Sequence, residues 1–211
     1  MLFQLLTKSN RPYVKKHLRQ NVPKHRHVAT ADSPYYTYVQ SPMCDWLVEF
    51  LPYWLAPNLI TLSGFSYNIV CVLLLVYFYG FDTEGPIGAW YSIWMGIAYF
   101  IYTTLDNMDG KQARRTGSGS PLGMLTDHGC DATTATILPF IFSRLVQVGT
   151  GLPVILISMI PTVPFYYLIY QEYYTGVLNL PFMSGPDDTS LMVTAVCWYT
   201  AWVGSHDFWA S

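Results

Sequence analysis

Long apolar runs alternate along this chain with short polar connections. Three runs contain no charged residue, at 51–81, 86–105 and 145–171, and a shorter fourth run covers 189–205. A helix that spans a bilayer core needs about 20 mostly apolar residues, so the first three runs are long enough and the fourth lies near the lower limit. A fifth candidate, 122–143, carries two acidic residues in its first half and continues as an apolar run. Such runs are too long for strands or buried helices of a soluble domain.

The pattern therefore predicts an all-α fold, a polytopic transmembrane helical bundle with about five spans. We expect these spans at about 59–81, 87–106, 121–143, 146–170 and 189–205. Composition agrees, because Asp, Glu, Lys and Arg make up 11% of the chain and the hydrophobic set makes up 52%. An average soluble domain has roughly 25% charged residues. The low charge argues against a cytosolic globule, and the high hydrophobicity argues against a disordered chain.

The basic residues orient the predicted bundle. Seven of the eleven lie before position 27, and Lys111, Arg114 and Arg115 lie between the second and third spans. Positively charged segments favour the cytoplasmic side of a membrane, so we expect the N-terminus and this connection to share that side. The two intervening spans require the same arrangement. Arg144 is expected on the opposite side and is the one exception.

The segment before the first span divides into two parts. Residues 1–44 predict a basic cytoplasmic arm lying on anionic lipid, although a mitochondrial targeting segment has the same excess of basic residues and stays an alternative. Asp45–Leu55 is short, aromatic and lightly charged, which predicts an amphipathic helix in the membrane interface. Residues 45–205 then form the predicted membrane domain. The four cysteines lack metal-binding spacing and are expected to pack as apolar side chains.

Four aspartates stand out where the second and third spans meet. Asp106 and Asp109 are three residues apart, and Asp127 and Asp131 are four apart, so each pair lies on one face of its helix. Two antiparallel helices with a short connection bring these faces together near the cytoplasmic interface. Carboxylates there are costly and repel one another unless cations bind. Hard oxygen ligands suit Mg²⁺, Mn²⁺ or Ca²⁺, and four carboxylates can hold two ions of a phosphoryl-transfer site. Pairing with the nearby basic residues in a solvated helix–loop–helix is the structural alternative.

The residues around the aspartates have roles that match such a site. Gly110 lets backbone and ligand approach closely, Ala113 keeps the same region narrow, and Gly123 lies on the helical stripe of the second aspartate pair. We expect Arg114 to bind a phosphate through two hydrogen bonds. Two further basic residues are alternatives for this role: Lys111 and Arg115.

The ordered set resembles the signature of the CDP-alcohol phosphotransferase family, with all eight fixed positions filled: Asp106-x2-Asp109-Gly110-x2-Ala113-Arg114-x8-Gly123-x3-Asp127-x3-Asp131. Three segments resemble the eukaryotic cholinephosphotransferase and ethanolaminephosphotransferase branch: APNLITLSG at 56–64, KQARRT at 111–116 and DHGCD at 127–131. The segment QEYYTG at 171–176 follows the branch less closely. The resemblance covers roughly residues 45–205.

The resemblance implies a reaction and its cofactors. Members of this branch transfer the phospho-alcohol group of CDP-ethanolamine or CDP-choline to diacylglycerol, release CMP, and form phosphatidylethanolamine or phosphatidylcholine. It implies Mg²⁺ or Mn²⁺, most readily two ions, with four aspartates as the expected metal site: Asp106, Asp109, Asp127 and Asp131. Asp131 matches the fourth aspartate, near the metals and the usual candidate for the general base. His128 is the rival for that base.

The same resemblance implies a set of residues near the nucleotide and its phosphates: Asn58, Gly110, Lys111, Ala113, Arg114 and Gly123. Glu172, at the cytoplasmic end of the fourth span, either contacts the amino-alcohol headgroup or simply lies at the water boundary. The sequence does not choose between ethanolamine and choline, because an aromatic-rich pocket suits both cations. Segment 171–176 slightly favours ethanolamine.

The expected location is an integral membrane protein of the endoplasmic reticulum or Golgi, with the site facing the cytoplasm. The expected partners are the CDP-alcohol, diacylglycerol and the lipid bilayer, a homodimer is a further expectation, and no nucleic acid is expected. Relatives in this branch are expected to be longer, with about ten spans. Residues 206–211 are therefore interpreted as a truncated tail, and a catalytically inactive isoform or a regulatory partner is an alternative.

Other functions stay open at this point. The first is a family member with inositol or glycerol phosphate as the acceptor. A Mg²⁺-dependent prenyltransferase also uses aspartate-rich helices, but it does not need Gly110, Arg114 and Gly123. A cation transporter predicts acidic residues at several membrane depths, whereas here they gather at one end of two helices.

Overall fold

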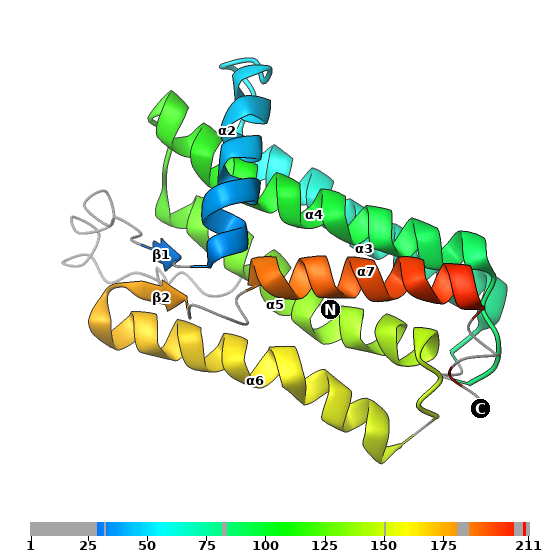
Figure 1. Cartoon of the computed structure of the whole chain (residues 1–211). Helices are drawn as coiled ribbons and strands as arrows, with labels where there is room; N and C mark the ends of the chain where they lie inside the picture. Colours follow the sequence, from blue (N-terminus) through cyan, green and yellow to red (C-terminus); the bar gives the residue numbers. More distant parts are fainter. Residues whose placement is uncertain are drawn as a thin grey trace, which may run out of the picture.

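The computed structural model describes residues 29–31, 33–81, 84–149, 151–180, 186–204 and 209. The predicted basic arm falls outside the described residues over 1–28, as does most of the predicted tail. The described part is a bundle of long helices with one short two-stranded sheet at its side (Figure 1). The predicted fold class, an all-α membrane bundle, is confirmed.

Five long helices form the bundle: α3 (Pro57–Tyr79), α4 (Ala89–Thr116), α5 (Pro121–Leu145), α6 (Leu152–Thr175) and α7 (Pro186–Val203). A π-helical turn, η2 (Tyr36–Gln40), leads directly into the shorter helix α2 (Ser41–Glu49). Strands β1 (Ala29–Ala31) and β2 (Leu178–Leu180) pair in parallel. The sheet fastens the segment before α2 to the connection between α6 and α7.

The ends of the helices follow from local chemistry. Helix α4 continues ten residues beyond the predicted end of the second span and stops at Gly117, whose φ of 65° is left-handed and suits glycine. Helix α5 begins at Pro121, and the hydroxyl of Ser120 accepts a hydrogen bond from the backbone N–H of Gly123 at 3.1 Å. The turn between α4 and α5 is therefore only four residues long.

Helix α2 differs from the interfacial helix predicted over Asp45–Leu55, because it begins and ends earlier, at Ser41 and Glu49. Proline at position 52 has no N–H to donate into a continuing helix, and the chain turns after Phe50. The exposed side of α2 and this turn carries large aromatic side chains: Trp46, Phe50, Tyr53 and Trp54. Such a surface suits the headgroup level of a membrane.

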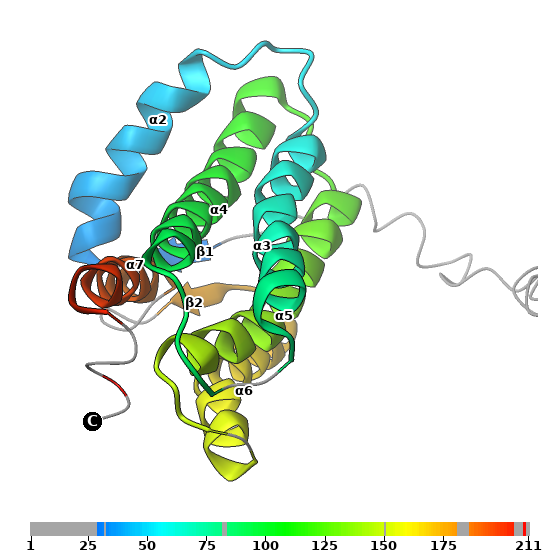
Figure 2. The same cartoon turned by 90° about the vertical axis from the view of Figure 1, so that its right-hand side faces the viewer.

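Two helices in the described part of the chain, α3 and α6, are long and apolar enough to cross a membrane, with mean hydropathies of 2.1 and 1.9 over 18 residues. The sequence pattern predicts about five spans. Helices α4, α5 and α7 have 28, 25 and 18 residues, but Tyr, Trp and Thr or charged side chains lower their hydropathy. In the bundle, α4 packs between α3 and α7, and α5 packs between α3 and α6 (Figure 2).

The main hydrophobic core lies away from the aspartates, around the fully buried Leu75, Tyr91 and Met95. Tyr91 is about 22 Å along α4 from Asp106, at 1.5 Å per residue. A smaller cluster of Cys44, Ile60 and Met108 joins α2, α3 and α4 beside the site. The far end of the bundle is thus apolar and closely packed, whereas the end with the aspartates is polar.

Helices α4 and α7 approach closely at Gly96. A Cβ added there would lie 2.7 Å from the indole nitrogen of Trp198, so the contact depends on the missing side chain. Arg144, the exception to the charge rule, is buried near the end of α5 with its guanidinium 5.8 Å from the ring centre of Tyr79.

Candidate metal and nucleotide site

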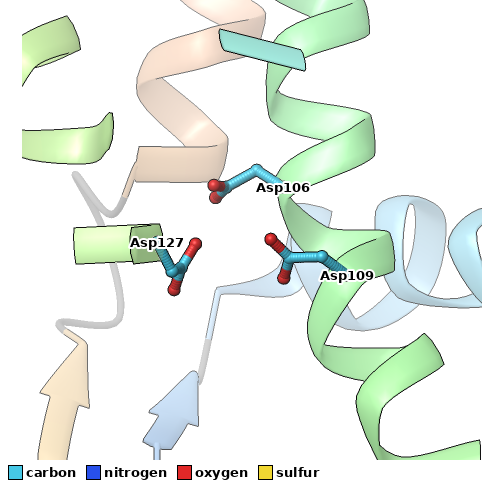
Figure 3. A group of neighbouring side chains, drawn as sticks. All are labelled: Asp106, Asp109 and Asp127. Carbon is cyan, nitrogen blue, oxygen red and sulfur yellow. The ribbon is translucent and has the colours of Figure 1, made fainter. Parts of the chain in front are cut away.

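Three of the four predicted aspartates converge where α4 meets α5. Asp106 and Asp109 project from α4 toward Asp127 on α5 (Figure 3). One carboxylate oxygen from each lies within 4.8 Å of the others. The close turn between the two helices creates this convergence, because it places the end of α4 beside the start of α5.

The donor set fits a divalent cation. One carboxylate oxygen of Asp106 and one of Asp127 are buried without a hydrogen-bond partner in the described part of the chain. Buried polar atoms almost always have a partner, and buried carboxylates that face one another repel. A hard cation such as Mg²⁺ or Mn²⁺ would satisfy both requirements.

Asp109 is held in place by α3. The hydroxyl of Thr61 donates to the second oxygen of the Asp109 carboxylate, and Asp109 is buried. Sequence reasoning missed Thr61, whose only signal was its place inside the segment 56–64 that carries the family resemblance.

Asp131 lies beside the three converging acids and interacts with Asp106. It is not in the group whose oxygens lie within 4.8 Å of one another. Instead, one of its carboxylate oxygens accepts a hydrogen bond from the hydroxyl of Tyr102 at 2.5 Å. His128 is half-buried one turn earlier on α5 and interacts electrostatically with Asp131. The structure therefore divides the predicted set of four into three converging carboxylates and one tethered carboxylate.

The structure brings several of the predicted nucleotide residues into two pairs. A Cβ on Gly123 would lie 3.3 Å from the side-chain oxygen of Asn58, so the start of α5 faces the start of α3. A Cβ on Gly110 would lie 3.5 Å from a guanidinium nitrogen of Arg114. Arg114 is exposed and acts electrostatically on Asp109. Ala113 is half-buried on the same helix.

Lys111 lies elsewhere. It is 8% exposed, and its ammonium group is 2.6 Å from a carboxylate oxygen of Asp45 and 2.8 Å from the hydroxyl of Ser41. Both partners belong to α2. These contacts give Lys111 a structural partner and do not support the expected contact with phosphate.

Arg115 and Gln112 also reach α2. Arg115 donates to the backbone carbonyls of Val48 at 2.8 Å and Leu51 at 2.7 Å, and its guanidinium carbon lies 4.0 Å from the ring centre of Tyr53. Gln112 donates to two carbonyls of the turn that follows α2. These bonds attach the C-terminal end of α2 and the turn that follows it to α4. We call Lys111, Gln112 and Arg115 the α2 clasp.

Cys44 is buried beneath the α2 clasp. Its thiol donates to the carbonyl of Thr104 at 3.7 Å. Burial raises the pKa of the Cys44 thiol to about 11, and the positive charge of Lys111 acts in the opposite direction. The thiol is therefore protonated near neutral pH, as expected for a packing residue.

Two further acidic residues lie near the site. Asn107 directly follows Asp106 in the sequence, and its side-chain amide donates at 2.9 Å to Asp187, at the start of α7. Asp188 accepts from the hydroxyl of Ser33 at 2.7 Å. Sequence reasoning did not single out this pair, which fastens α7 to the chain. Glu172 is buried near the C-terminal end of α6, on the helix that packs against α5.

Comparison with known proteins identifies the family. The family described as CDP-alcohol phosphatidyltransferase matches residues 54–210. The chain belongs to that family. Membership confirms the resemblance seen in the sequence and argues against the prenyltransferase and transporter alternatives.

Relatives within the CDP-alcohol phosphatidyltransferase family include enzymes named for choline and ethanolamine. The chain is 34% identical to choline/ethanolaminephosphotransferase 2 of Arabidopsis thaliana, over 94% of this chain and 50% of the relative. It is 35% identical to ethanolaminephosphotransferase 1 of Homo sapiens, over 91% and 50%. An uncharacterized class-I family protein 3 of Dictyostelium discoideum is 36% identical over 90% and 47%. The chain thus spans about half the length of the curated relatives it matches.

Proposed function

We propose that this chain transfers the phospho-alcohol group of CDP-ethanolamine or CDP-choline to diacylglycerol, which releases CMP and forms phosphatidylethanolamine or phosphatidylcholine. The observation that carries the proposal is the convergence of three carboxylates within 4.8 Å in a chain of this family. The names of relatives at 34% and 35% identity support choline or ethanolamine as the alcohol that is transferred.

Asp106, Asp109 and Asp127 would hold the metal, which we propose to be two Mg²⁺ or Mn²⁺ ions. Bound there, divalent ions would neutralise the donor's pyrophosphate and the charge that develops on the leaving CMP. Thr61 fixes the orientation of Asp109 by its hydrogen bond, so this ligand is set before any substrate binds.

The remaining site residues would position the donor. Arg114, exposed beside Gly110, would bind a phosphate through two hydrogen bonds. Asn58 and Gly123 would contact the nucleotide at the start of α3 and α5, and the half-buried Ala113 would keep this region narrow. We leave Lys111 out of the phosphate-binding set, because Asp45 and Ser41 occupy its ammonium group.

The chemical step would proceed in line at the β-phosphorus. The diacylglycerol hydroxyl oxygen bonds to that phosphorus while its bond to the oxygen bridging to CMP breaks, and CMP leaves with the electron pair. The hydroxyl proton passes to Asp131, the first choice for general base, with His128 as the alternative. We further propose an endoplasmic reticulum or Golgi membrane with this site facing the cytoplasm, where a soluble donor meets a lipid acceptor. The homodimer stays a prediction.

The test is an assay of the purified chain in lipid nanodiscs that contain diacylglycerol. With Mg²⁺ or Mn²⁺, radiolabelled CDP-ethanolamine or CDP-choline should yield labelled phospholipid, and EDTA should abolish the product. Running both donors side by side determines the headgroup preference. A parallel reaction with CDP-diacylglycerol and inositol or glycerol phosphate tests the other acceptors.

An outcome without any product would contradict the proposal if Mn²⁺ still binds the protein with the stoichiometry of an intact site. That result would favour the alternative, a catalytically inactive isoform or regulatory partner.

A further inference from the structure

Asp131 on α5 is held by a buried tyrosine of α4, the neighbouring helix of the site. Tyr102 donates its hydroxyl to one Asp131 oxygen at 2.5 Å, and only 5% of Tyr102 is exposed. Tyr102 lies on α4 one turn before Asp106, whereas Asp131 lies on α5. The bond therefore ties the two helices of the site together at the one carboxylate outside the converging group.

The phenol of Tyr102 is itself fixed in place. Its ring stacks on Tyr99, with centroids 6.1 Å apart and an angle of 22° between the planes. Thr134 on α5 forms a side-chain hydrogen bond with Tyr102, and Asn68 on α3 donates its amide to the Thr134 hydroxyl at 3.1 Å. The four side chains Asn68, Thr134, Tyr102 and Asp131 thus form one chain of hydrogen bonds.

This chain of bonds runs in one direction. Asn68 donates through its amide, and Tyr102 can only donate to the Asp131 carboxylate, so Thr134 receives one bond and gives the next. Asn68 and Thr134 are 2% and 4% exposed, in the interior of helices that pack in the bundle. Buried polar side chains in a membrane protein are costly to keep, which points to a role beyond packing.

We propose that Tyr102 is a positioning residue that acts through Asp131 in the phosphotransfer reaction, supported from behind by Thr134 and Asn68. The bond occupies Oδ1 of the Asp131 carboxylate and thereby fixes the orientation of that carboxylate beside Asp106. Tyr102 therefore sets the direction in which Asp131 acts, without touching the substrate. The expected change in kcat rests on the proposed function. The expected coupling between Tyr102 and Asp131 in protein stability rests on the structure alone.

The kinetic test compares Tyr102→Phe with the matched control Tyr91→Phe. Tyr91 is a fully buried tyrosine of the same helix, and its hydroxyl donates to the carbonyl of Cys71 at 2.9 Å, far from the aspartates. Each variant loses one buried hydroxyl and keeps the ring. We expect Tyr102→Phe to lower kcat about 10- to 100-fold with each KM within about threefold of the parent. Tyr91→Phe should leave kcat within twofold, and Thr134→Val should give a smaller fall than Tyr102→Phe.

A double-mutant cycle tests whether Tyr102 acts through Asp131. In an Asp131→Asn background, Tyr102→Phe should cause little further loss of kcat, because the group that it positions is gone. Melting temperatures in an Asp131→Ala background, where no side-chain oxygen remains to accept the Tyr102 hydroxyl, should show the same non-additivity, and that measurement needs no turnover. A full second loss in the Asp131→Asn background, a kcat for Tyr102→Phe within twofold of the parent, or an equal fall of kcat in Tyr91→Phe would overturn the inference.

The two proposals fail in different ways. If the parent chain makes no phospholipid, the proposed function fails, and the melting-temperature cycle still decides whether Tyr102 and Asp131 are coupled. If the parent is active and the cycle is additive, only the positioning role fails.

Discussion

The last three turns of α4 carry two kinds of charged surface, one toward α5 and one toward α2. Asp106 and Asp109 face α5, where carboxylate oxygens converge and a buried Asp106 oxygen lacks a partner in the described part of the chain. Lys111 and Arg115 face α2, where each polar group meets a carboxylate, a hydroxyl or a backbone carbonyl. On the side toward α2, the protein itself supplies the partners of the charged groups. On the side toward α5, a bound cation would supply the partner that the carboxylates lack.

The separation arises because successive residues of a helix turn by about 100°. Asp109 and Lys111 are two residues apart and so point about 160° apart, while Arg114 lies between the two sides, about 80° from Asp106 and about 60° from Lys111. Neighbouring residues of one motif therefore divide between the proposed metal site and the attachment of α2, and the partners of each side chain decide which role it has.

The largest effect is expected from Asp127→Asn on the aspartate side. This change removes a metal ligand and should lower kcat by about 10³-fold or more. The protein should remain inserted and folded without metal, because one of several repelling charges is gone. Product assays and Mn²⁺ titration measure both expectations. Retained turnover would refute the metal role of Asp127.

Arg114 and Lys111 provide the next comparison, since both are basic and only three residues apart. Arg114→Gln should lower kcat/KM about 100-fold, because a bidentate phosphate contact is lost, and Arg114→Lys should recover only part of it. Lys111→Gln should cost less than tenfold. Steady-state kinetics at varied CDP-alcohol concentrations distinguish the two variants. An equal loss of kcat/KM in Arg114→Gln and Lys111→Gln would contradict the different roles given to the two residues.

Arg115→Met should weaken the attachment of α2 rather than the chemistry. Loss of the hydrogen bonds to the carbonyls of Val48 and Leu51 should lower the free energy of unfolding by about 2 kcal/mol. Chemical unfolding in detergent measures this value. Asp45→Asn is the milder control and should cost less than about 1 kcal/mol, because Asp45 is 63% exposed. A larger cost for Asp45→Asn than for Arg115→Met would contradict this assignment.

The smallest effect concerns the Cys44 thiol, which lies on the buried face of α2 and has its pKa raised to about 11. At pH 7.5 it should react with N-ethylmaleimide much more slowly than an exposed cysteine, and Arg115→Met should speed the reaction. Mass spectrometry of the peptide that contains Cys44 follows the labelling. Rapid labelling in the parent chain would show that α2 does not stay attached.

The sequence predicted the all-α class and the pairing of the aspartates because both depend on local patterns. Apolar runs give helices, and spacings of three and four residues give shared helix faces. The partners of these residues depend on tertiary packing. Thr61 and Tyr102 reach Asp109 and Asp131 from other helices, and no local pattern marks them.

The same limit explains Lys111. Its charge and position within the motif suit phosphate binding, but the cover that α2 places over this side of α4 is not written in the neighbouring residues. The chain turns before Leu51, so α2 ends early, at Glu49. Arg115 donates a hydrogen bond to the carbonyl of Leu51 in this turn. Sequence thus indicated which residues are chemically capable of a role, and packing decided which of them are free to perform it.

The α2 clasp has a further consequence for where the reaction takes place. Trp46 on α2 and Phe50 directly after it are 60% and 68% exposed and are expected to rest among lipid headgroups. Arg115 ties that helix to α4 only six residues, or about 9 Å, beyond Asp109. In the proposed reaction, this attachment of α2 would keep the carboxylates at a constant height relative to the membrane surface, so that the water-soluble donor and the lipid acceptor would meet in the same plane.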